Sequence, residues 1–337
     1  MIKEKPTKSD STKRAYIERA KSMVANFEAA TGEKMMANDP RFISFFLEKT
    51  KNKSQSNWRQ LKASLIYYFD ITNQEKLSAS IGAMDVNHID TTKKSILNLT
   101  SSKKKKSITE AERTKLTKYL IASGGSSSAP TYDKALVCMF NASIATGLRP
   151  IEWSTAEILS ESPVEEGINL EPPVLKVKNA KATNGRSYGE YRYLGLSSLN
   201  EININFVRLA LSLSSKPIDN KGNPTTYSRF YESCRRRFYD VVNHVFKNPR
   251  DNRITLYTAR HQFIANLKAA GYPLEEIACL VGHGNDLTAS KHYGKRRCGN
   301  KEATGFPIAN KADISKVRAK YHQFAQESAN SIHKKDS

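Results

Sequence analysis

The stretch that decides the fold runs from Leu256 to Tyr293 and reads LYTARHQFIANLKAAGYPLEEIACLVGHGNDLTASKHY. It holds two apolar patterns at helical spacing. The first ends at Gly271, and Pro273 then begins the second, which matches the usual preference for glycine after a helix and proline at its start. Gly282 closes the second pattern. The stretch therefore predicts two short helices joined by a tight turn.

Three polar residues stand out in this apolar setting. Arg260 is expected in the first turn of the first helix, His283 at the end of the second, and Tyr293 ten residues beyond that histidine. Taken singly, such an arginine is usually a solvated surface charge and such a histidine a helix cap. Their combination in one stretch indicates a functional site.

A second informative stretch lies upstream at residues 145–153 and reads ATGLRPIEW. The segment 135–145 before it is almost wholly apolar and predicts a buried helix. Gly147 ends that helix, and Pro150 suits the first position of the next one. Arg149 is therefore expected in a turn between two packed helices.

Together, the two stretches resemble the signature of the tyrosine recombinases, the phage-integrase-like family. Arg-His-x-Phe, Val-Gly-His and the following tyrosine match its C-terminal half, and Thr-Gly-Leu-Arg-x-x-Glu matches its first box, with Arg149 and Glu152 in register. The two boxes occur in the right order, about a hundred residues apart. The resemblance covers residues 135–295 strongly and residues 10–80 loosely.

Composition limits the partners of this 337-residue chain. Its 54 Lys and Arg residues outnumber 33 Asp and Glu residues, for a net charge of +21, which favours polyanions such as nucleic acid or an anionic membrane. The sequence has no apolar run of 18 residues and no secretory signal, so we expect no membrane partner and a cytoplasmic protein, associated with the nucleoid if bacterial. The cysteines are scattered without zinc spacing, which predicts reduced thiols, no metal site and no cofactor: Cys138, Cys234, Cys279 and Cys298.

The N-terminal part, residues 1–100, is expected to be a small helical bundle. Asp10 is predicted to cap a first helix, Asp39-Pro40 to start a second and Ser54 to open a third, with a fourth over 75–81. The bundle resembles the SAM-like core-binding domain of the same family. Its third helix has a basic face that either is solvated or contacts DNA phosphates, and the candidate residues are Arg59 and Lys62.

Residues 101–107 are predicted to form a linker before a catalytic domain over 108–337. Helical periodicity lapses here, and four consecutive lysines repel one another and favour an extended segment: Lys103, Lys104, Lys105 and Lys106. Such a segment either binds a DNA backbone, with release of counterions, or serves only as a solubilising linker.

A β-hairpin is predicted from two apolar runs, 174–177 and 191–196, on either side of a long polar turn. The expected fold class is therefore mainly α, with an α+β catalytic domain that contains a small antiparallel sheet. The family resemblance implies a catalytic lysine on this hairpin turn. Lys181 fits that pattern better, and Lys178 remains the alternative.

The last part of the chain contains two more predicted features. A long helix through Phe230 and Val245 carries consecutive arginines, of which Arg235 and Arg236 are candidates for DNA contact. From Asp313 onward, apolar residues at helical spacing predict an amphipathic tail helix: Ile314, Val317, Tyr321 and Phe324. That helix either folds onto its own domain or, as in the family, docks on a neighbouring protomer.

The resemblance also implies a reaction. Tyr293 would be the nucleophile that forms a covalent 3′-phosphotyrosyl intermediate during strand exchange, without a metal ion. Arg149 and Arg260 would clamp the phosphate, Lys181 would protonate the leaving 5′ oxygen, and His283 would bind the phosphate or handle the tyrosine proton. The implied partners are double-stranded DNA with an inverted-repeat recombination site and three further copies of the protein, in a tetramer on DNA that serves a mobile element.

One residue departs from the family pattern. The family usually has His or Lys three residues before the second arginine, where this chain has Tyr257, a phenol that is neutral at physiological pH. Tyr257 is therefore a possible catalytic or phosphate-contacting residue, whereas His261 and His292 are expected to be structural neighbours. The alternatives are a telomere resolvase, an enzyme similar to type IB topoisomerases, or a DNA-binding protein that does not cleave.

Overall fold

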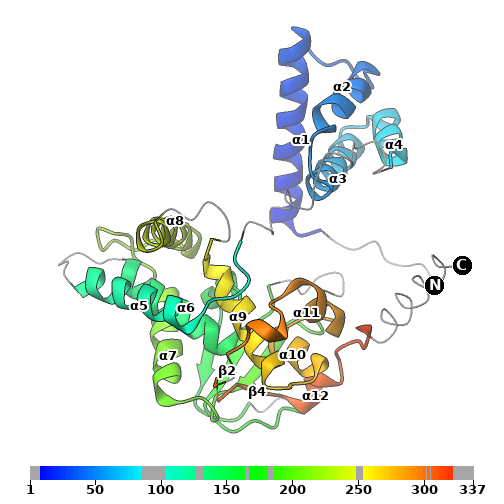
Figure 1. The fold of residues 1–337 in the computed structure, drawn as a ribbon. Coiled ribbons are helices and arrows are strands. Elements are labelled where there is room, and N and C mark those ends of the chain that lie inside the picture. The colour runs from blue at the N-terminus through cyan, green and yellow to red at the C-terminus, as the bar shows by residue number, and fades with distance from the viewer. Residues whose placement is uncertain are drawn as a thin grey trace, which may run out of the picture. The chain divides into compact units, whose positions relative to one another are not determined.

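The computed structural model describes residues 8–85, 104–125, 132–163, 167–180, 186–247, 253–300, 302–303 and 305–321. The chain divides into two compact units, residues 1–102 and 103–337, each with its own core (Figure 1). Among the helices described, none is both long and apolar enough to span a bilayer.

The first unit consists of four helices: α1 (Asp10–Thr31), α2 (Arg41–Thr50), α3 (Gln55–Ile71) and α4 (Glu75–Ala83). The cap of α1 is Ser9, whose hydroxyl accepts a hydrogen bond from the Thr12 amide, so the expected cap at Asp10 is wrong by one residue. Ser54 caps α3 as predicted. The bundle is therefore close to what the apolar spacing indicated.

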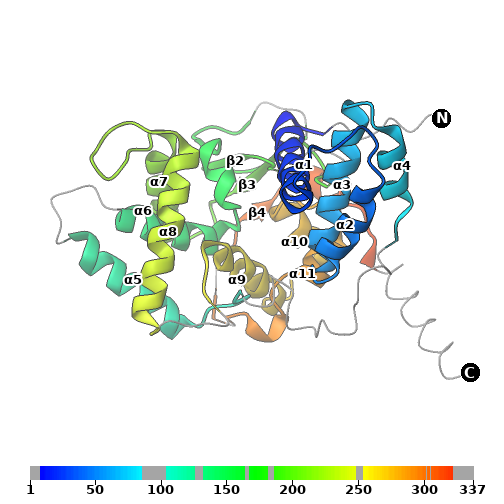
Figure 2. The same cartoon turned by 90° about the horizontal axis from the view of Figure 1, so that it is seen from above.

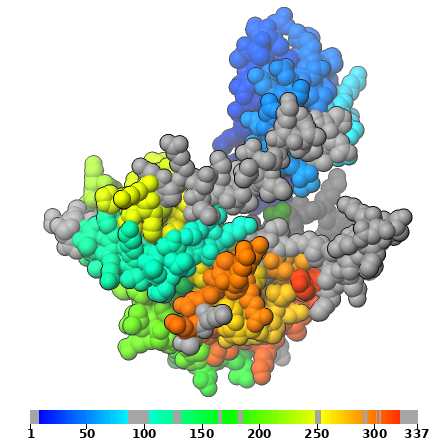
Figure 3. Space-filling model, viewed as in Figure 1, coloured from blue at the N-terminus to red at the C-terminus, as the bar shows by residue number. Residues whose placement is uncertain are grey.

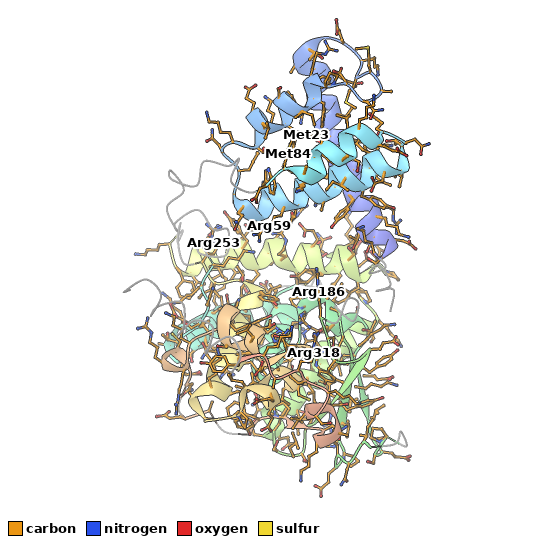
Figure 4. All side chains as sticks on the ribbon, turned by 90° about the vertical axis from the view of Figure 1, so that its right-hand side faces the viewer. Met23, Arg59, Met84, Arg186, Arg253 and Arg318 are labelled. Carbon is orange, nitrogen blue, oxygen red and sulfur yellow. The ribbon has the colours of Figure 1, made fainter. Side chains whose placement is uncertain are left out.

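The core of the first unit is aromatic. Phe42 packs edge-on against Phe27 and Phe69, with ring centroids 5.5 and 5.4 Å apart. Met23 is buried beside them, and Figure 4 labels it together with the exposed-face residue Arg59 of α3. The Lys62 ammonium group donates to carbonyl oxygens at the end of α4, one of them that of Gly82 at 2.8 Å.

The second unit contains the remaining elements: α5 (Glu110–Gly125), α6 (Tyr132–Thr146), η3 (Pro150–Ser154), β1 (Glu157–Leu159), β2 (Val174–Lys178), β3 (Tyr191–Gly195), α7 (Glu201–Ser215), α8 (Tyr227–Val245), α9 (Leu256–Ala269), α10 (Leu274–Leu280), α11 (Asp286–His292), η4 (Arg296–Cys298), β4 (Ile308–Ala309) and α12 (Lys311–Ile314). The described strands form one antiparallel sheet in the order β1-β2-β3-β4. The prediction of a mainly helical fold with a small antiparallel sheet is confirmed.

The helix α6 is the centre of the second unit, because almost all of its side chains are buried. Helices α5, α7, α8 and α9 pack around it. In Figure 2, α8 crosses over α6. The Phe140 ring of α6 lies 5.2 Å from the Phe238 ring of α8. An apolar helix surrounded in this way holds Arg149, which follows its C-terminus, in a fixed place.

The helix α9 begins one turn earlier than the sequence indicated. Thr255 and Thr258 form a reciprocal cap, in which the Thr255 amide donates to the Thr258 hydroxyl at 2.9 Å. Arg260 consequently lies in the second turn of α9 and not in the first. Arg260 is completely buried there.

The tail differs from the single amphipathic helix that was expected from Asp313. Only the residues of α12 are helical before the chain turns, and Ile314 and Val317 pack on the core of their own unit. The Asp286 carboxylate accepts the amides of Lys320 and Tyr321, which fastens the next residues as well. Ile314 and Val317 therefore do not belong to a free docking surface, and Phe324 lies outside the described residues.

Candidate active site

Arg149 and Glu152 are joined at the start of η3. The Glu152 carboxylate accepts the Arg149 amide at 2.8 Å and the Arg149 guanidinium at 2.6 Å, and both side chains are buried. Gly147 makes this turn possible. Its φ of 69° suits glycine, and a Cβ there would lie 2.3 Å from Cδ1 of Phe263. The tight turn therefore places Arg149 directly against α9.

Arg192 on β3 is a site residue that sequence reasoning missed. Its guanidinium is fully buried and donates to Glu152 at 2.7 Å, to the Asn179 side chain at 2.5 Å and to the Leu280 carbonyl at 3.1 Å. Arg192 thus connects η3, the hairpin and the end of α10. The missed signal was its strand position, because Arg192 shares a face of β3 with buried Leu194.

Arg260 holds the ends of two helices together. Its guanidinium donates to the Gly147 carbonyl at 2.6 Å and to the Val281 carbonyl at 2.7 Å. One nitrogen lies 3.1 Å from Nε2 of His283, and another lies 3.9 Å from the Glu152 carboxylate. Arg149 and Arg260, far apart in sequence, therefore meet around one buried carboxylate, as the two family boxes implied.

His283 follows the C-terminus of α10 and is almost completely buried. Its amide donates to the Ala278 carbonyl at 2.8 Å, which closes the helix, and its Nε2 lies 3.2 Å from the Tyr293 hydroxyl oxygen. Burial, together with Arg260 and Arg149, lowers the pKa of His283 well below its ordinary value. The imidazole is therefore neutral at physiological pH.

Tyr293 lies directly after α11, with the Arg260 guanidinium carbon 5.5 Å from its ring centroid. The next segment packs tightly on α9. A Cβ on Gly294 would lie 2.7 Å from the His261 carbonyl oxygen, and one on Gly299 would lie 2.2 Å from that of Ala265. Figure 3 shows this segment in orange over α9 in yellow. The contacts between this segment and α9, the helix that carries Arg260, therefore hold Tyr293 in place.

The site has an excess of buried positive charge. Arg149, Arg192 and Arg260 contribute three positive charges, Glu152 contributes one negative charge and His283 is neutral, which leaves a net charge of +2. Among the described residues, Nε of Arg149, Nε of Arg260 and Nδ1 of His283 have no hydrogen-bond partner. Buried charge and unpaired donors of this kind suit an anionic ligand such as a phosphodiester.

The two hairpin lysines are in different situations. Lys181 lies outside the described residues, but the amide of the preceding Ala180 donates to Glu152 at 3.3 Å, which anchors the start of that turn at the site. Lys178 pairs with Tyr191 in the sheet, whereas Arg192 pairs with Val177, so Lys178 lies on the opposite face. Glu190, 3.1 Å away, raises the pKa of Lys178. Lys178 thus lies on the face of the hairpin opposite Arg192, and the role of Lys181 stays a prediction.

Among the described residues, the remaining candidates for DNA contact are exposed or paired with other groups. Lys103 is outside the described residues, Lys104 and Lys106 are exposed, and Lys105 pairs with Glu112. Arg235 and Arg236 are exposed and share Glu232. Lys62 caps α4, and Arg59 is exposed. Their contact with DNA stays a prediction.

Two histidines next to the signature positions were expected to be structural. The His261 ring packs against Tyr293, with ring centroids 4.9 Å apart. Burial, together with the nearby charge of Lys106, lowers the pKa of His261 to about 4. The side chain of His292 lies outside the described residues. Within the described part of the chain, no three His, Cys, Asp or Glu side chains gather as a metal site.

Solved structures of tyrosine recombinases resemble this chain over most of its length. A lambda integrase dimer bound to a COC' core site has 14% identity and a TM-score of 0.49, covering 86% of this chain and 90% of that chain. The Tn1549 transposon integrase in complex with transposon right end DNA has 15% identity and a TM-score of 0.48, covering 86% and 90%. The XerH site-specific recombinase bound to difH substrate has 15% identity and a TM-score of 0.44, covering 83% and 75%.

No protein-family model matches the chain, and no curated protein matches it in sequence. The structural similarities are distant. The function is therefore inferred from the side chains of the site.

Proposed function

We propose that this protein is a site-specific DNA recombinase of the tyrosine class, which cleaves and rejoins DNA through a covalent 3′-phosphotyrosyl intermediate. The observation that carries the proposal is the Tyr293 hydroxyl, 3.2 Å from Nε2 of neutral His283 and beside fully buried Arg260. A phenol next to a base and buried guanidinium groups has the parts needed for nucleophilic attack on a phosphate.

The reaction follows from these positions. The Tyr293 oxygen attacks phosphorus while its proton passes to His283, and the bond to the 5′ oxygen breaks. Lys181 supplies the proton that the leaving 5′ oxygen takes up. The transition state has more negative charge than the starting diester, and the net charge of +2 in the site stabilises that increase. The tyrosyl ester conserves the bond energy, so that another strand's 5′-hydroxyl reverses the step.

A DNA-binding protein that does not cleave is the main alternative of a different class. Such a protein needs basic residues at its surface, but it has no need to bury three arginines around one carboxylate next to a tyrosine and a histidine. Burial of these charges costs free energy, which is expected where an anionic ligand or a reaction uses them. The arrangement of Arg149, Arg260, His283 and Tyr293 therefore favours an enzyme.

The proposed partners are double-stranded DNA with inverted-repeat sites and further copies of the protein. One Tyr293 cuts one strand, whereas exchange between two duplexes needs four cuts, which implies a tetramer. Residues 322–337 are the segment proposed to join neighbours, because residues up to Tyr321 are fastened to their own unit by Asp286.

Truncation after Tyr321 tests this assembly. The shortened protein should bind a single site normally but should recombine poorly, as measured by gel shift and by product formation. Truncation after Asn310 is the contrasting variant, because it removes buried Val317 and should destabilise the unit itself. Normal recombination by the protein that ends at Tyr321 would contradict a role of the tail in assembly.

Covalent capture tests the proposed reaction. The substrates are nicked duplexes that together cover the DNA flanking the gene. After cleavage, the short strand between the cut and the nick dissociates, so its 5′-hydroxyl cannot rejoin and the covalent intermediate accumulates. The wild-type protein should give a denaturation-resistant adduct in the presence of EDTA, and Tyr293→Phe should give none while it binds DNA normally. An adduct that forms only with a divalent metal ion would contradict the proposed chemistry.

A further inference from the structure

Tyr257 contacts the proposed nucleophile directly. It lies on α9, one turn before Arg260, and its hydroxyl oxygen is 2.9 Å from that of Tyr293. The Tyr257 ring packs edge-on against His261, with centroids 5.3 Å apart, which fixes its orientation. This is the position at which the chain departs from the family pattern of His or Lys.

The direction of the hydrogen bond between the two hydroxyl groups follows from the neighbours. Arginine only donates, so Nε2 of His283, 3.1 Å from the Arg260 guanidinium, must be the unprotonated ring nitrogen. The Tyr293 hydroxyl, 3.2 Å from the same nitrogen, therefore acts as a hydrogen-bond donor there and shares the single lone pair of that nitrogen with Arg260. The oxygen of Tyr293 then has lone pairs left for Tyr257, which acts as the donor.

We infer that Tyr257 is a catalytic residue that donates a hydrogen bond to the Tyr293 oxygen and so activates the nucleophile. The inference rests on the proposed function, since it assigns a role within the same reaction. A donor at this place has two effects. It orients the attacking oxygen before DNA binds, and it stabilises the negative charge that this oxygen carries when its proton leaves.

The same contact serves the rejoining step. There the incoming 5′-hydroxyl oxygen forms a bond to phosphorus while its proton passes to Lys181, which is neutral after the cleavage step. The bond between phosphorus and the Tyr293 oxygen breaks with its electron pair on that oxygen. The Tyr257 hydrogen bond stabilises this leaving phenolate until it recovers its proton from His283. Tyr257 keeps its own proton throughout, so no further reactant is needed.

The ionisable groups around Tyr293 determine the expected pH dependence. Tyr257, Arg260 and His261 face it from α9, Arg149 from the turn before η3, and His283 from the end of α10. Burial alone would raise the pKa of Tyr293, but Arg260 and the hydrogen bond from Tyr257 lower it below its ordinary value. Burial raises the pKa of Tyr257, so it keeps its proton at a pH at which Tyr293 loses its own.

The test is the pH profile of single-turnover cleavage by Tyr257→Phe. Loss of the donor raises the pKa of Tyr293, so half-maximal cleavage should move to higher pH. Cleavage at neutral pH should fall about three- to tenfold, the usual effect of one hydrogen bond, and should approach the wild-type rate at high pH, where Tyr293 is ionised without the donor. Recovery at high pH would also show that the variant is folded.

Tyr188→Phe is the matched control. The Tyr188 hydroxyl is likewise part-buried and hydrogen-bonded, to the Cys279 carbonyl at 3.2 Å, but it does not touch Tyr293. Its removal should leave the pH profile unchanged. A second variant, Tyr257→His, keeps an N–H donor and should have a midpoint between those of the wild type and Tyr257→Phe.

The outcomes separate this inference from the proposed function. If the wild-type protein forms an adduct through Tyr293 but both Tyr257 variants keep the wild-type midpoint, the role of Tyr257 is overturned and the recombinase chemistry stands. A uniform loss at every pH would likewise overturn the activating role, because it would indicate damage to packing. If the wild-type protein forms no adduct at all, the proposed function itself fails.

Discussion

Two glutamates of the second unit are each shared by more than one arginine, but one glutamate is buried and the other is exposed. Glu152 accepts hydrogen bonds from Arg149 and Arg192 and has no exposed side-chain surface. Glu232 on α8 also binds two arginines, but its side chain is 41% exposed. The same residue types thus form the buried framework of the candidate active site in one place and a solvated surface cluster in the other.

Burial determines how strongly the protein depends on each of these two carboxylates. Around Glu152, burial would raise the carboxyl pKa, but Arg192, Arg149 and Arg260 lower it far below the ordinary value, so Glu152 stays ionised. Around Glu232, hydrogen bonds from Arg235 and Arg236 lower the pKa to about 2, but water and salt screen the exposed charges. Only the buried cluster should therefore control stability and chemistry.

The largest expected effect follows from removing the buried carboxylate. Glu152→Ala leaves three buried guanidinium groups without a counter-charge, and unfolding should become easier by about 3–5 kcal/mol, as for other broken buried pairs. Urea unfolding measures this. Glu232→Ala is the control and should keep the wild-type midpoint. An equal change in both variants would contradict the distinction between the clusters.

Low pH should also reveal the contribution of the buried Glu152 cluster to stability. The pKa of Glu152 is lower in the folded than in the unfolded protein, so its contribution to stability is present above its ordinary value of 4.5 and is lost as the pH falls below it. The wild-type protein should therefore lose stability progressively below about pH 4.5. Glu152→Ala should lose less over that range, which acid titration of the unfolding midpoint would show.

An intermediate effect is expected on the hairpin, where Lys178 is exposed and Lys181 is the proposed acid. Lys181→Ala should slow cleavage of ordinary DNA by roughly 10² to 10⁴-fold, the usual range for a lost general acid. A substrate with a 5′-bridging sulfur has a better leaving group and should restore most of that rate. Lys178→Ala should be nearly normal on both substrates, and the reverse pattern would move the general acid to Lys178.

The smallest effect is expected from the exposed cluster itself. If Arg235 and Arg236 contact phosphates, their joint replacement by alanine should weaken DNA binding and reduce the salt dependence of affinity by about one counterion for each lost contact. Cleavage at saturating DNA should not change. An unchanged salt slope would show that these arginines are solvated surface residues.

The sequence predicted those features that depend on apolar periodicity and local caps. These features are the Ser54 cap of α3, the buried helix α6, and the hairpin of β2 and β3. The two motif boxes also indicated that Arg149 and Arg260 would meet. Strands β1 and β4 escaped prediction because three and two residues are too few to show a period.

The rest of the site depends on contacts between distant segments. Arg192 is buried because Glu152, Asn179 and Leu280 supply its partners, and its position on a strand face does not identify those partners. The split tail has a similar cause, since the Asp286 carboxylate, far upstream, binds amides that a continuous helix would have used. The hydroxyl contact of Tyr257 likewise arises between α9 and the end of α11.

The most direct test of the account is to identify the residue bound to DNA. Tyr257 and Tyr293 have hydroxyl oxygens 2.9 Å apart, so both lie within reach of one phosphate. Protease digestion of the trapped adduct, followed by mass spectrometry of the peptide linked to nucleotide, distinguishes them. We predict that the nucleotide is attached only to Tyr293, through a 3′-phosphate. Attachment to Tyr257 or to any other residue would contradict the assignment of the nucleophile.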